Sequence, residues 1–490
     1  MSDARYDAIV IGGGVGGLVA STYLARAGRR VLLLEAEDRT GGSCRAVTSL
    51  TGVRASLRTQ VLDAIDPRVV KELGLTRRGL RFAARDLSLM RLCRDGDSLA
   101  LARDAHAAAR AVATHSPADG IAYKHFQAEI FALARAMRPG WWENASRMPR
   151  PDKATQRRLL KQLGAASAVA VVNERFESEG LRAALAFGVS SPFEPGSALA
   201  LVWRASQEMC GLQGAVAVPQ GGPAALIAAL VAAAQEAGAE LRTKARASRL
   251  VLAGNAAAGV ALDTGETVFA RTVLSCLSRR DTLLDLAPTA SGGFDETFAL
   301  RRSGSPTGTA SILFVLNSSP GIGGKDAALA SRFVIADRIA CPAANGNRPR
   351  EGCLPEDLAI EAFVPTAVDR TLALPGQHLL SIRVHGVPLA TRSEWALLSA
   401  RLAERVVSAL EPHAVHLRER IVGMDMCAPE EVAATCTARI LSSYAERIAT
   451  PIEGLFLCGK TAEPVDAISG RAGRIAANIA NGWLEREKHP

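Results

Sequence analysis

Closely spaced glycines that join an apolar strand to a helix are the feature that most constrains this chain. The apolar strand is residues 6–11, and it runs directly into Gly12, Gly14 and Gly17. A segment with helical periodicity, 18–27, follows at once. This order of strand, glycines and helix is the context that a dinucleotide-binding turn requires. We therefore predict a βαβ unit at the start of the chain.

Each part of this unit has a physical role. Gly12 permits the tight turn, Gly14 lets backbone N–H groups approach a pyrophosphate, and Gly17 allows close helix packing. The positive end of the helix then faces the phosphates. A second apolar strand ends at Glu35, whose carboxylate would accept hydrogen bonds from ribose hydroxyls. We expect the unit to bind its cofactor through Gly12, Gly14, Val15, Gly16, Gly17, Glu35 and Ala36.

The other end of the chain has the pattern of a second half of the same site. Residues 454–459 form an apolar strand that ends in Gly459. Ile468, Ser469 and Gly470 lead into a helix through Ala477. A helix N-terminus at this place could stabilise negative charge on a reduced cofactor. The glycine motif alone does not separate NAD from FAD, so neighbouring residues must decide.

Those neighbours resemble one family of FAD proteins. Arg39-Thr40-Gly41-Gly42 is similar to the second glycine pair of the amine oxidase and phytoene desaturase superfamily. Stretches 58–75, 176–182 and 219–222 resemble its phytoene desaturase-like branch, in the pyridine nucleotide-disulfide oxidoreductase-like subgroup. The resemblance implies FAD as cofactor, with contacts from Gly41, Gly42, Val251, Gly459 and Ile468. Val251 represents an approximate placement within 249–251.

Length and patterning predict two interleaved domains. The chain has 490 residues, of which 48% are hydrophobic, more than one domain usually contains. We expect an α/β fold, with a Rossmann-type FAD-binding domain and an interleaved α+β substrate domain that carries a helical insertion. The FAD-binding parts are 1–54, 215–288 and 433–490, and the substrate parts are 55–214 and 289–432. Strands at 311–316, 359–364 and 377–384 could form the floor of a substrate cavity.

Composition narrows the compartment and the partners. Nine cysteines without a C-x-x-C pair fit a reduced cytoplasmic protein better than a disulfide framework. His413 and His416 lack a third ligand, so we expect no metal. The net charge of +9 leaves peripheral contact with acidic lipid open, but the chain lacks the aromatic-interleaved basic run of a nucleic-acid binder. No apolar stretch reaches the length of a membrane span.

The C-terminal motif departs from the family pattern, which is roughly C-G-x-G-T-H-P-G-G-G. Here Glu463 occupies the histidine position, and Val465, Asp466 and Ala467 replace the glycines. Side chains in place of glycine must change the loop or the space beside the flavin. By their motif positions, Lys460, Glu463 and Asp466 are the candidate catalytic residues.

The resemblance implies hydride transfer from a substrate C–H bond to flavin. A helical insertion over a sheet suits a lipophilic substrate, so our leading prediction is a desaturase or dehydrogenase of a lipophilic, isoprenoid-like molecule. A flavin amine oxidase is one alternative, although the chain has only four tyrosines and five tryptophans from which to build an aromatic cage. A flavin-binding isomerase or a non-redox binding protein is another. The electron acceptor and the oligomeric state stay open.

Overall fold

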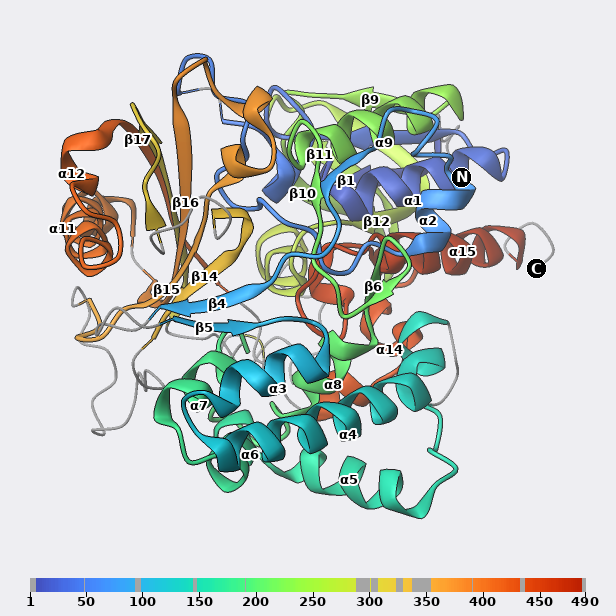
Figure 1. Ribbon diagram of the computed structural model, residues 1–490. Helices are drawn as coiled ribbons and strands as arrows, with labels where there is room; N and C mark the ends of the chain where they lie inside the picture. The colour runs from blue at the N-terminus through green and yellow to red at the C-terminus, as the bar shows by residue number, and fades with distance from the viewer. Residues whose placement is uncertain are drawn as a thin grey trace.

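Two sheets and a bundle of helices make up the molecule. The structure is a computed structural model, which describes residues 6–47, 49–92, 98–143, 148–189, 191–287, 300, 307–322, 329–336, 354–389, 391–431 and 437–486. Figure 1 shows the first sheet at the upper right, the second sheet at the left and the helices below both. The mixed α/β fold agrees with the predicted class.

The first sheet is built from both ends and the middle of the chain. In the described residues its strand order is β10-β11-β12-β1-β2-β9, and β18 also pairs with β12. The pairs among β9, β2, β1, β12 and β18 are parallel, whereas β10 and β11 are antiparallel additions. The bounds are β1 Tyr6–Ile11, β2 Val31–Leu34, β9 Glu240–Arg242, β10 Ala247–Ala253, β11 Ala256–Leu262, β12 Thr267–Ser275 and β18 Leu455–Leu457.

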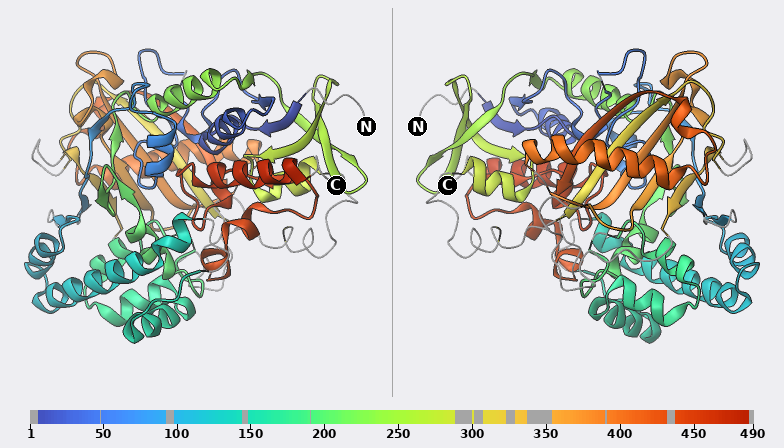
Figure 2. Two further views of the ribbon diagram at one scale, coloured as in Figure 1. Left: turned by 90° about the vertical axis from the view of Figure 1, so that its right-hand side faces the viewer. Right: turned by 90° about the vertical axis from the view of Figure 1, so that its left-hand side faces the viewer.

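Three helices cover one face of this sheet. They are α1 (Val15–Arg26), α9 (Ala224–Glu236) and α15 (Arg471–Arg486). Small and branched apolar side chains such as Leu18, Leu230 and Ala476 are fully buried between the helices and the strands. Figure 2 shows α1 and α15 side by side across the sheet. The sheet therefore places the N-terminal ends of α1 and α15 close together.

The second sheet is mostly antiparallel, with the order β17-β13-β16-β15-β14-β4-β5 in the described residues. Helix α11 (Arg392–Leu410) packs on one face, where every second residue of the central strands is buried and apolar (Figure 2, right). A capping box at Thr391 and Glu394 begins this helix. The bounds are β4 Leu89–Leu92, β5 Ser98–Leu101, β13 Thr307–Leu316, β14 Arg332–Ile335, β15 Ala359–Phe363, β16 His378–Pro388 and β17 Ile421–Glu431.

The helical region forms a core of its own. Its longest helix, α4 (Pro117–Trp142), begins at Ser116, whose side chain accepts a hydrogen bond from Asp119 N, and Pro117 occupies the first helical position. Aromatic side chains, including Trp141 and Trp203, fill its centre. The other helices are α3 Ala105–Ala113, α5 Ala154–Ala165, α6 Ala168–Arg175, α7 Glu179–Ala186 and α8 Leu199–Ser206.

Short elements join these three parts. The helices are α2 Pro67–Glu72, α12 Leu417–Arg420, α13 Thr437–Leu441 and α14 Tyr444–Ile448, with 3-10 turns η1 Gly42–Cys44, η5 Pro365–Ala367, η6 Arg370–Leu372 and η7 Lys460–Ala462 and a π-helical turn η2 Asp281–Leu286. The short strands are β3 Phe82–Ala84, β6 Glu208–Met209, β7 Leu212–Gln213 and β8 Val218–Pro219.

The predicted elements are mostly present, with two corrections. The strands expected at 267–269 and 272–275 are one continuous strand, β12, because Ala270 and Arg271 continue the extended backbone without interruption. The strand expected at 215–219 is reduced to β8, because only Val218 and Pro219 pair with β3.

The domain boundaries stay predictions, although the packing is informative. Leu62, Leu73 and Leu80 lie in the core under the first sheet, while β4 and β5 join the second sheet. The segment 55–214 thus contributes to all three parts of the molecule. Among the described residues, no helix combines the length and the apolar character needed to cross a membrane.

Candidate flavin site

The glycine turn after β1 has the geometry that the sequence predicts. Gly12 has φ +96°, a conformation that side chains disfavour. A Cβ atom on Gly17 would lie 2.0 Å from the carbonyl oxygen of Gly12, so only glycine allows α1 to pack this closely. At Gly14, the N-cap of α1, the nearest atom to an added Cβ is Cys276 Sγ at 3.4 Å. The turn is thus tight behind the helix and open at its tip.

The two ends of the chain meet at this turn. A Cβ atom on Gly16 would lie 2.0 Å from the carbonyl oxygen of Cys458, and one on Gly473 would lie 2.3 Å from the carbonyl oxygen of Gly16. A Cβ atom on Gly459 would lie 2.3 Å from the carbonyl oxygen of Cys276. The C-terminal strand and helix therefore pack directly against the N-terminal turn, as expected of two halves of one site. Sequence reasoning missed Gly473 and Cys276.

Two thiols lie beneath the turn. Cys276 follows β12 and Cys458 follows β18, and these strands are paired in register up to the preceding residues. The pKa of Cys276 is lowered, first by a hydrogen bond from Cys458 and, against burial, by the N–H groups of Gly17 and Gly14. The pKa of Cys458 is raised by the same contact and by burial.

Glu35 lies where the second strand ends, as predicted. Its carboxylate accepts hydrogen bonds from Gly13 N at 2.8 Å and Glu37 N at 2.9 Å, and the side chain is buried. Each carboxylate oxygen has two acceptor positions, so capacity for ribose hydroxyls is left. Ala36, half-buried, follows directly in the bend after the strand.

The second glycine pair folds back onto the turn. Gly41 N donates to Gly13 O at 2.8 Å, and an added Cβ on Gly42 would lie 3.3 Å from the Cα of Gly14. Both residues have positive φ, +137° and +53°. Gly41 and Gly42 therefore lie beside the predicted phosphate turn.

The adenine side differs from the approximate placement at Val251. That residue lies in β10, opposite Gly259 of β11. The neighbour of Glu35 is Ala245, whose N–H donates to Glu35 O at 2.9 Å. An apolar residue between Lys244 and Arg246, just after a strand, was the available sequence signal. Contact of Val251 with the cofactor stays a prediction.

The residues at the turn fit an adenine dinucleotide. The first intrahelical bond of α1 runs from Leu18 N to Gly14 O, so the N–H groups of Val15 and Gly16 have no acceptor within the helix. Such groups at a helix N-terminus bind phosphate. Glu35 supplies the ribose acceptor, and no side chain projects from Gly14 or Gly42. These four features match the donor and acceptor set of the nucleotide half of FAD.

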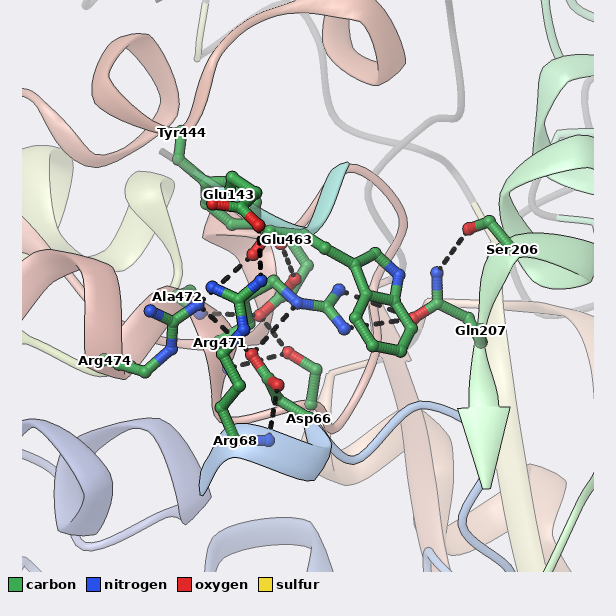
Figure 3. A network of polar contacts seen from close by, with 12 residues as sticks. Asp66, Arg68, Glu143, Ser206, Gln207, Tyr444, Glu463, Arg471, Ala472 and Arg474 are labelled. Carbon is green, nitrogen blue, oxygen red and sulfur yellow. Dashed lines mark hydrogen bonds and ion pairs between the residues drawn. The ribbon is translucent and has the colours of Figure 1, made fainter. Parts of the chain in front are cut away.

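At the flavin end, Glu463 is enclosed by donors. Its side chain is 1% exposed and accepts hydrogen bonds from the hydroxyls of Tyr444 and Ser469 and from Ala472 N, the last at 2.9 Å. Ala472 is the second residue of α15, so the carboxylate holds the N-terminus of this helix (Figure 3). Burial, and then the charge of Glu463, raise the pKa of Tyr444.

Two buried arginines extend this network. Arg471 Nε and Arg474 Nη2 each lie 3.3 Å from Asp66 Oδ2, and Asp66 and the Arg471 side chain are fully buried. Figure 3 shows Asp66 below the two guanidinium groups and Gln207 facing Arg471 from the other side. Gln207 Oε1 is 3.4 Å from Arg471 Nη1, and the Arg471 guanidinium lies 4.7 Å from the centre of the Trp142 ring.

Sequence reasoning missed this arginine pair. Arg471 and Arg474 are charged residues three apart in a segment that is otherwise small and apolar, which was a usable signal. Asp66 precedes a proline, a typical helix N-cap, and its other oxygen accepts from Arg68 N. Their pairing joins positions 405 residues apart.

The two other candidate catalytic residues lie in the same loop. The Asp466 carboxylate accepts a hydrogen bond from Arg439, and this pair is largely buried. Lys460 begins the turn η7, and its charge counteracts the effect of burial on Cys44, whose pKa is raised to about 12. Ile468 packs partly buried against the core under the first sheet. Catalytic roles for Lys460, Glu463 and Asp466 stay predictions.

Comparison with known proteins identifies the family. The model of the flavin-containing amine oxidoreductase family matches residues 15–310, more than half of the chain. The chain belongs to this family. It is an FAD-dependent oxidoreductase, and the glycine turn with its C-terminal partner is the candidate FAD site. The recognised resemblance is thereby confirmed.

Individual relatives agree with this assignment. Pyridine nucleotide-disulfide oxidoreductase domain-containing protein 2 of Mus musculus is 27% identical, covering 97% of this chain and 93% of the mouse protein. One component of the limonene dehydrogenase of Castellaniella defragrans is 30% identical over 26% of this chain and 24% of its own. A putrescine oxidase variant has a similar fold, with a TM-score of 0.65 at 15% identity, over 98% of this chain and 99% of that one.

Proposed function

We propose that this flavoprotein is a dehydrogenase or desaturase that removes hydride from a C–H bond of a lipophilic, isoprenoid-like substrate. Bound FAD supplies the redox chemistry by accepting the hydride at N5. The protein then has to position the substrate, exclude water and hold the flavin edge in a fixed electrostatic environment.

The observation that carries this proposal is that all four tyrosines of the chain are engaged away from a common cage. Tyr6 donates to Glu240, Tyr23 donates to Glu72, and Tyr444 donates to Glu463. Tyr123 is buried in the helical core beside Phe176. An amine oxidase built on paired tyrosine rings around the substrate would need at least some of these side chains. Their commitment favours C–H oxidation of a substrate without an amine.

A partial relative adds weight from sequence. The protein that shares 30% identity over 133 residues is named for the dehydrogenation of limonene, a hydrocarbon. Its match covers about a quarter of each chain, so it supports the reaction class rather than a particular substrate.

The flavin loop supports positioning rather than free acid or base chemistry. Each oxygen of Glu463 already accepts from a hydroxyl, and one also accepts from Ala472 N. Asp466 is paired with Arg439. Hydride removal from an unactivated carbon needs alignment with the flavin ring more than it needs a strong base, so this loop suits a rigid wall. Glu463 and Arg471 are thus positioning residues in the proposal.

Anaerobic titration of the purified yellow protein tests the proposal. Limonene and citronellol represent isoprenoids, octanoate represents acyl chains, and putrescine and cyclohexylamine represent amines. We expect the isoprenoid class to bleach the flavin absorbance and the amines to leave it unchanged. Bleaching by an amine would instead favour an amine oxidase, and a flavin that resists dithionite would favour a non-redox binding protein.

A further inference from the structure

The face of the second sheet that points away from α11 is strongly polar. In β16, Leu380, Ile382 and Val384 pack towards α11, which leaves Arg383 on the opposite face. The same alternation leaves Glu361 of β15 on that face. A floor for a purely hydrocarbon substrate would be apolar at these positions, so the charges need an explanation.

The charged side chains on this face form one cluster around Glu361. Glu361 lies directly opposite Arg383 in the register of β15 and β16. Arg332 Nη2 is 2.7 Å from Glu361 Oε1, and Arg383 Nη1 is 3.5 Å from Glu361 Oε2. His385 Nε2 lies 4.0 Å from the same Oε2. We call Arg204, Arg332, Arg383 and His385 the basic cluster.

Arg204 belongs to the cluster but has no carboxylate of its own. Its two terminal nitrogens both donate to one neutral acceptor, the carbonyl oxygen of Phe187, at 3.1 Å. Burial, and then the charge of Arg332, lower the pKa of Arg204 to about 10. The ring of Phe187 also packs edge-on against His385, with centroids 4.9 Å apart.

The cluster has more positive charge and more donors than its own acceptors satisfy. Three guanidinium groups are near two carboxylates, Glu361 and Asp63, which leaves one positive charge. Arg383 Nε and His385 Nε2 are buried and have no hydrogen-bond partner among the described residues. Buried groups of this kind are rare in native proteins. Arg383 nevertheless keeps 43% of its side-chain surface exposed, so a ligand can approach it.

Two short connections place the cluster near the flavin end of the site. Asp63 is three residues before Asp66, and Arg204 is three residues before Gln207. Asp66 and Gln207 both contact Arg471, the first residue of α15. Three residues of chain span at most about 10 Å. The basic cluster and the N-terminus of the flavin helix are therefore neighbours.

We propose that the basic cluster binds the carboxylate of an amphipathic substrate, so that the oxidised molecule is an acyl-chain or isoprenoid acid. This inference rests on the proposed dehydrogenase function and narrows its substrate class. A single carboxylate balances the one excess positive charge. The planar guanidinium of Arg383 suits the two oxygens of a carboxylate, and its free Nε is the donor that the ligand would satisfy.

Binding of matched ligands tests the proposal without turnover. Citronellate and citronellol share one isoprenoid chain and differ in the carboxylate, and isothermal titration calorimetry of the FAD-loaded protein gives both dissociation constants. We expect citronellate to bind about tenfold or more tightly, the usual effect of a hydrogen bond to a charged group. Equal affinities would overturn the proposal.

Variants assign the preference to the cluster. R383M should bring the ratio of the two dissociation constants close to one, mainly by weakening citronellate, while R383K should retain part of it. R103M removes an arginine of a partly exposed ion pair with Asp86 and should keep the wild-type ratio. An unchanged ratio in R383M would overturn the proposal, and the wild-type comparison still decides if R383M does not retain FAD.

Flavin bleaching separates this inference from the function on which it rests. If citronellate binds more tightly than citronellol and also bleaches the flavin, both proposals are supported. If the acid binds more tightly but neither ligand nor the wider panel bleaches the flavin, the carboxylate site is supported and the dehydrogenase function is contradicted. If citronellol bleaches the flavin and binds as tightly as the acid, the opposite conclusion follows.

Discussion

At the scale of single residues, Gly16 shows how little space the flavin site leaves. Its missing Cβ would lie 2.0 Å from the backbone oxygen of Cys458, where no side chain can move aside. We expect G16A to separate β18 from α1 and to abolish FAD binding. The FAD content of the purified variant, measured by its visible spectrum, checks this.

Gly482 provides the matched control for that substitution. It lies in α15, and the nearest atom to an added Cβ is Arg486 Nη1 at 3.8 Å. G482A should retain FAD and gain about 0.5–1 kcal/mol in the free energy of unfolding, because alanine is the better helix residue. A yellow, stable G16A protein would contradict our description of the turn.

Glu463 is the residue whose role most needs an experiment. E463Q keeps the shape of the side chain but turns one acceptor into a donor that faces Ala472 N or a hydroxyl. We expect the free energy of unfolding to fall by about 1.5–3 kcal/mol, as for the loss of a hydrogen bond to a charged group. Denaturation of the wild type, E463Q, Y444F and the double variant measures this loss and its coupling to Tyr444.

The alternative outcome is equally clear. If Glu463 were the general base, E463Q would lose about a hundredfold or more in kcat while its stability stayed unchanged. That result would return Glu463 to a catalytic role and contradict the positioning role proposed above.

At the scale of elements, Asp66 joins α2 to α15. Its carboxylate is the shared partner of Arg471 and Arg474 and is fully buried. D66N should lower the free energy of unfolding by about 3–5 kcal/mol, because two buried guanidinium groups lose their counter-ion. Chemical denaturation of the variant provides the measurement.

An ion pair on the surface provides the comparison. Asp86 pairs with Arg103, and both side chains keep about a third of their surface exposed. D86N should cost less than about 1 kcal/mol. Equal losses for D66N and D86N would mean that the buried network contributes no more than a surface pair.

The second sheet should show a distinct dependence of stability on pH. Burial alone would raise the pKa of Glu361, but Arg332, His385 and Arg383 hold it well below its ordinary value. The resulting stabilisation is complete above the unfolded pKa of about 4.5 and is lost as the pH falls towards the folded pKa. The stability difference between wild type and E361Q should therefore be constant above about pH 5 and shrink below it. Denaturation at several pH values tests this, and a difference that grows on acidification would contradict it.

The sequence predicted local elements better than long-range contacts. The βαβ unit and the C-terminal strand and helix were predictable because glycines, apolar runs and a terminal acid follow in a fixed order. The contact of Ala245 with Glu35 was misplaced towards Val251, because strand periodicity does not tell which residue crosses the nucleotide. The pairing of Asp66 with Arg471 was not predictable, because no local pattern relates side chains 405 positions apart.

At the scale of the whole molecule, three separately folded parts meet around Arg471. Asp66 comes from a short helix under the first sheet, and Trp142 and Gln207 come from the ends of two helices in the helical region. The cluster around Glu361 adds the second sheet through Arg204. A change at this meeting point should therefore affect both the flavin edge and the substrate-binding sheet. Sequence could predict that such parts exist but not where they touch.

The central claim is that this family member is a redox-active flavoprotein that oxidises a C–H bond of a lipophilic substrate. Anaerobic titration of the FAD-loaded protein, followed by its visible spectrum, tests that claim most directly. We predict that an isoprenoid or acyl compound bleaches the flavin and that the amines do not. Bleaching by an amine alone, or a flavin that dithionite cannot reduce, would contradict the account.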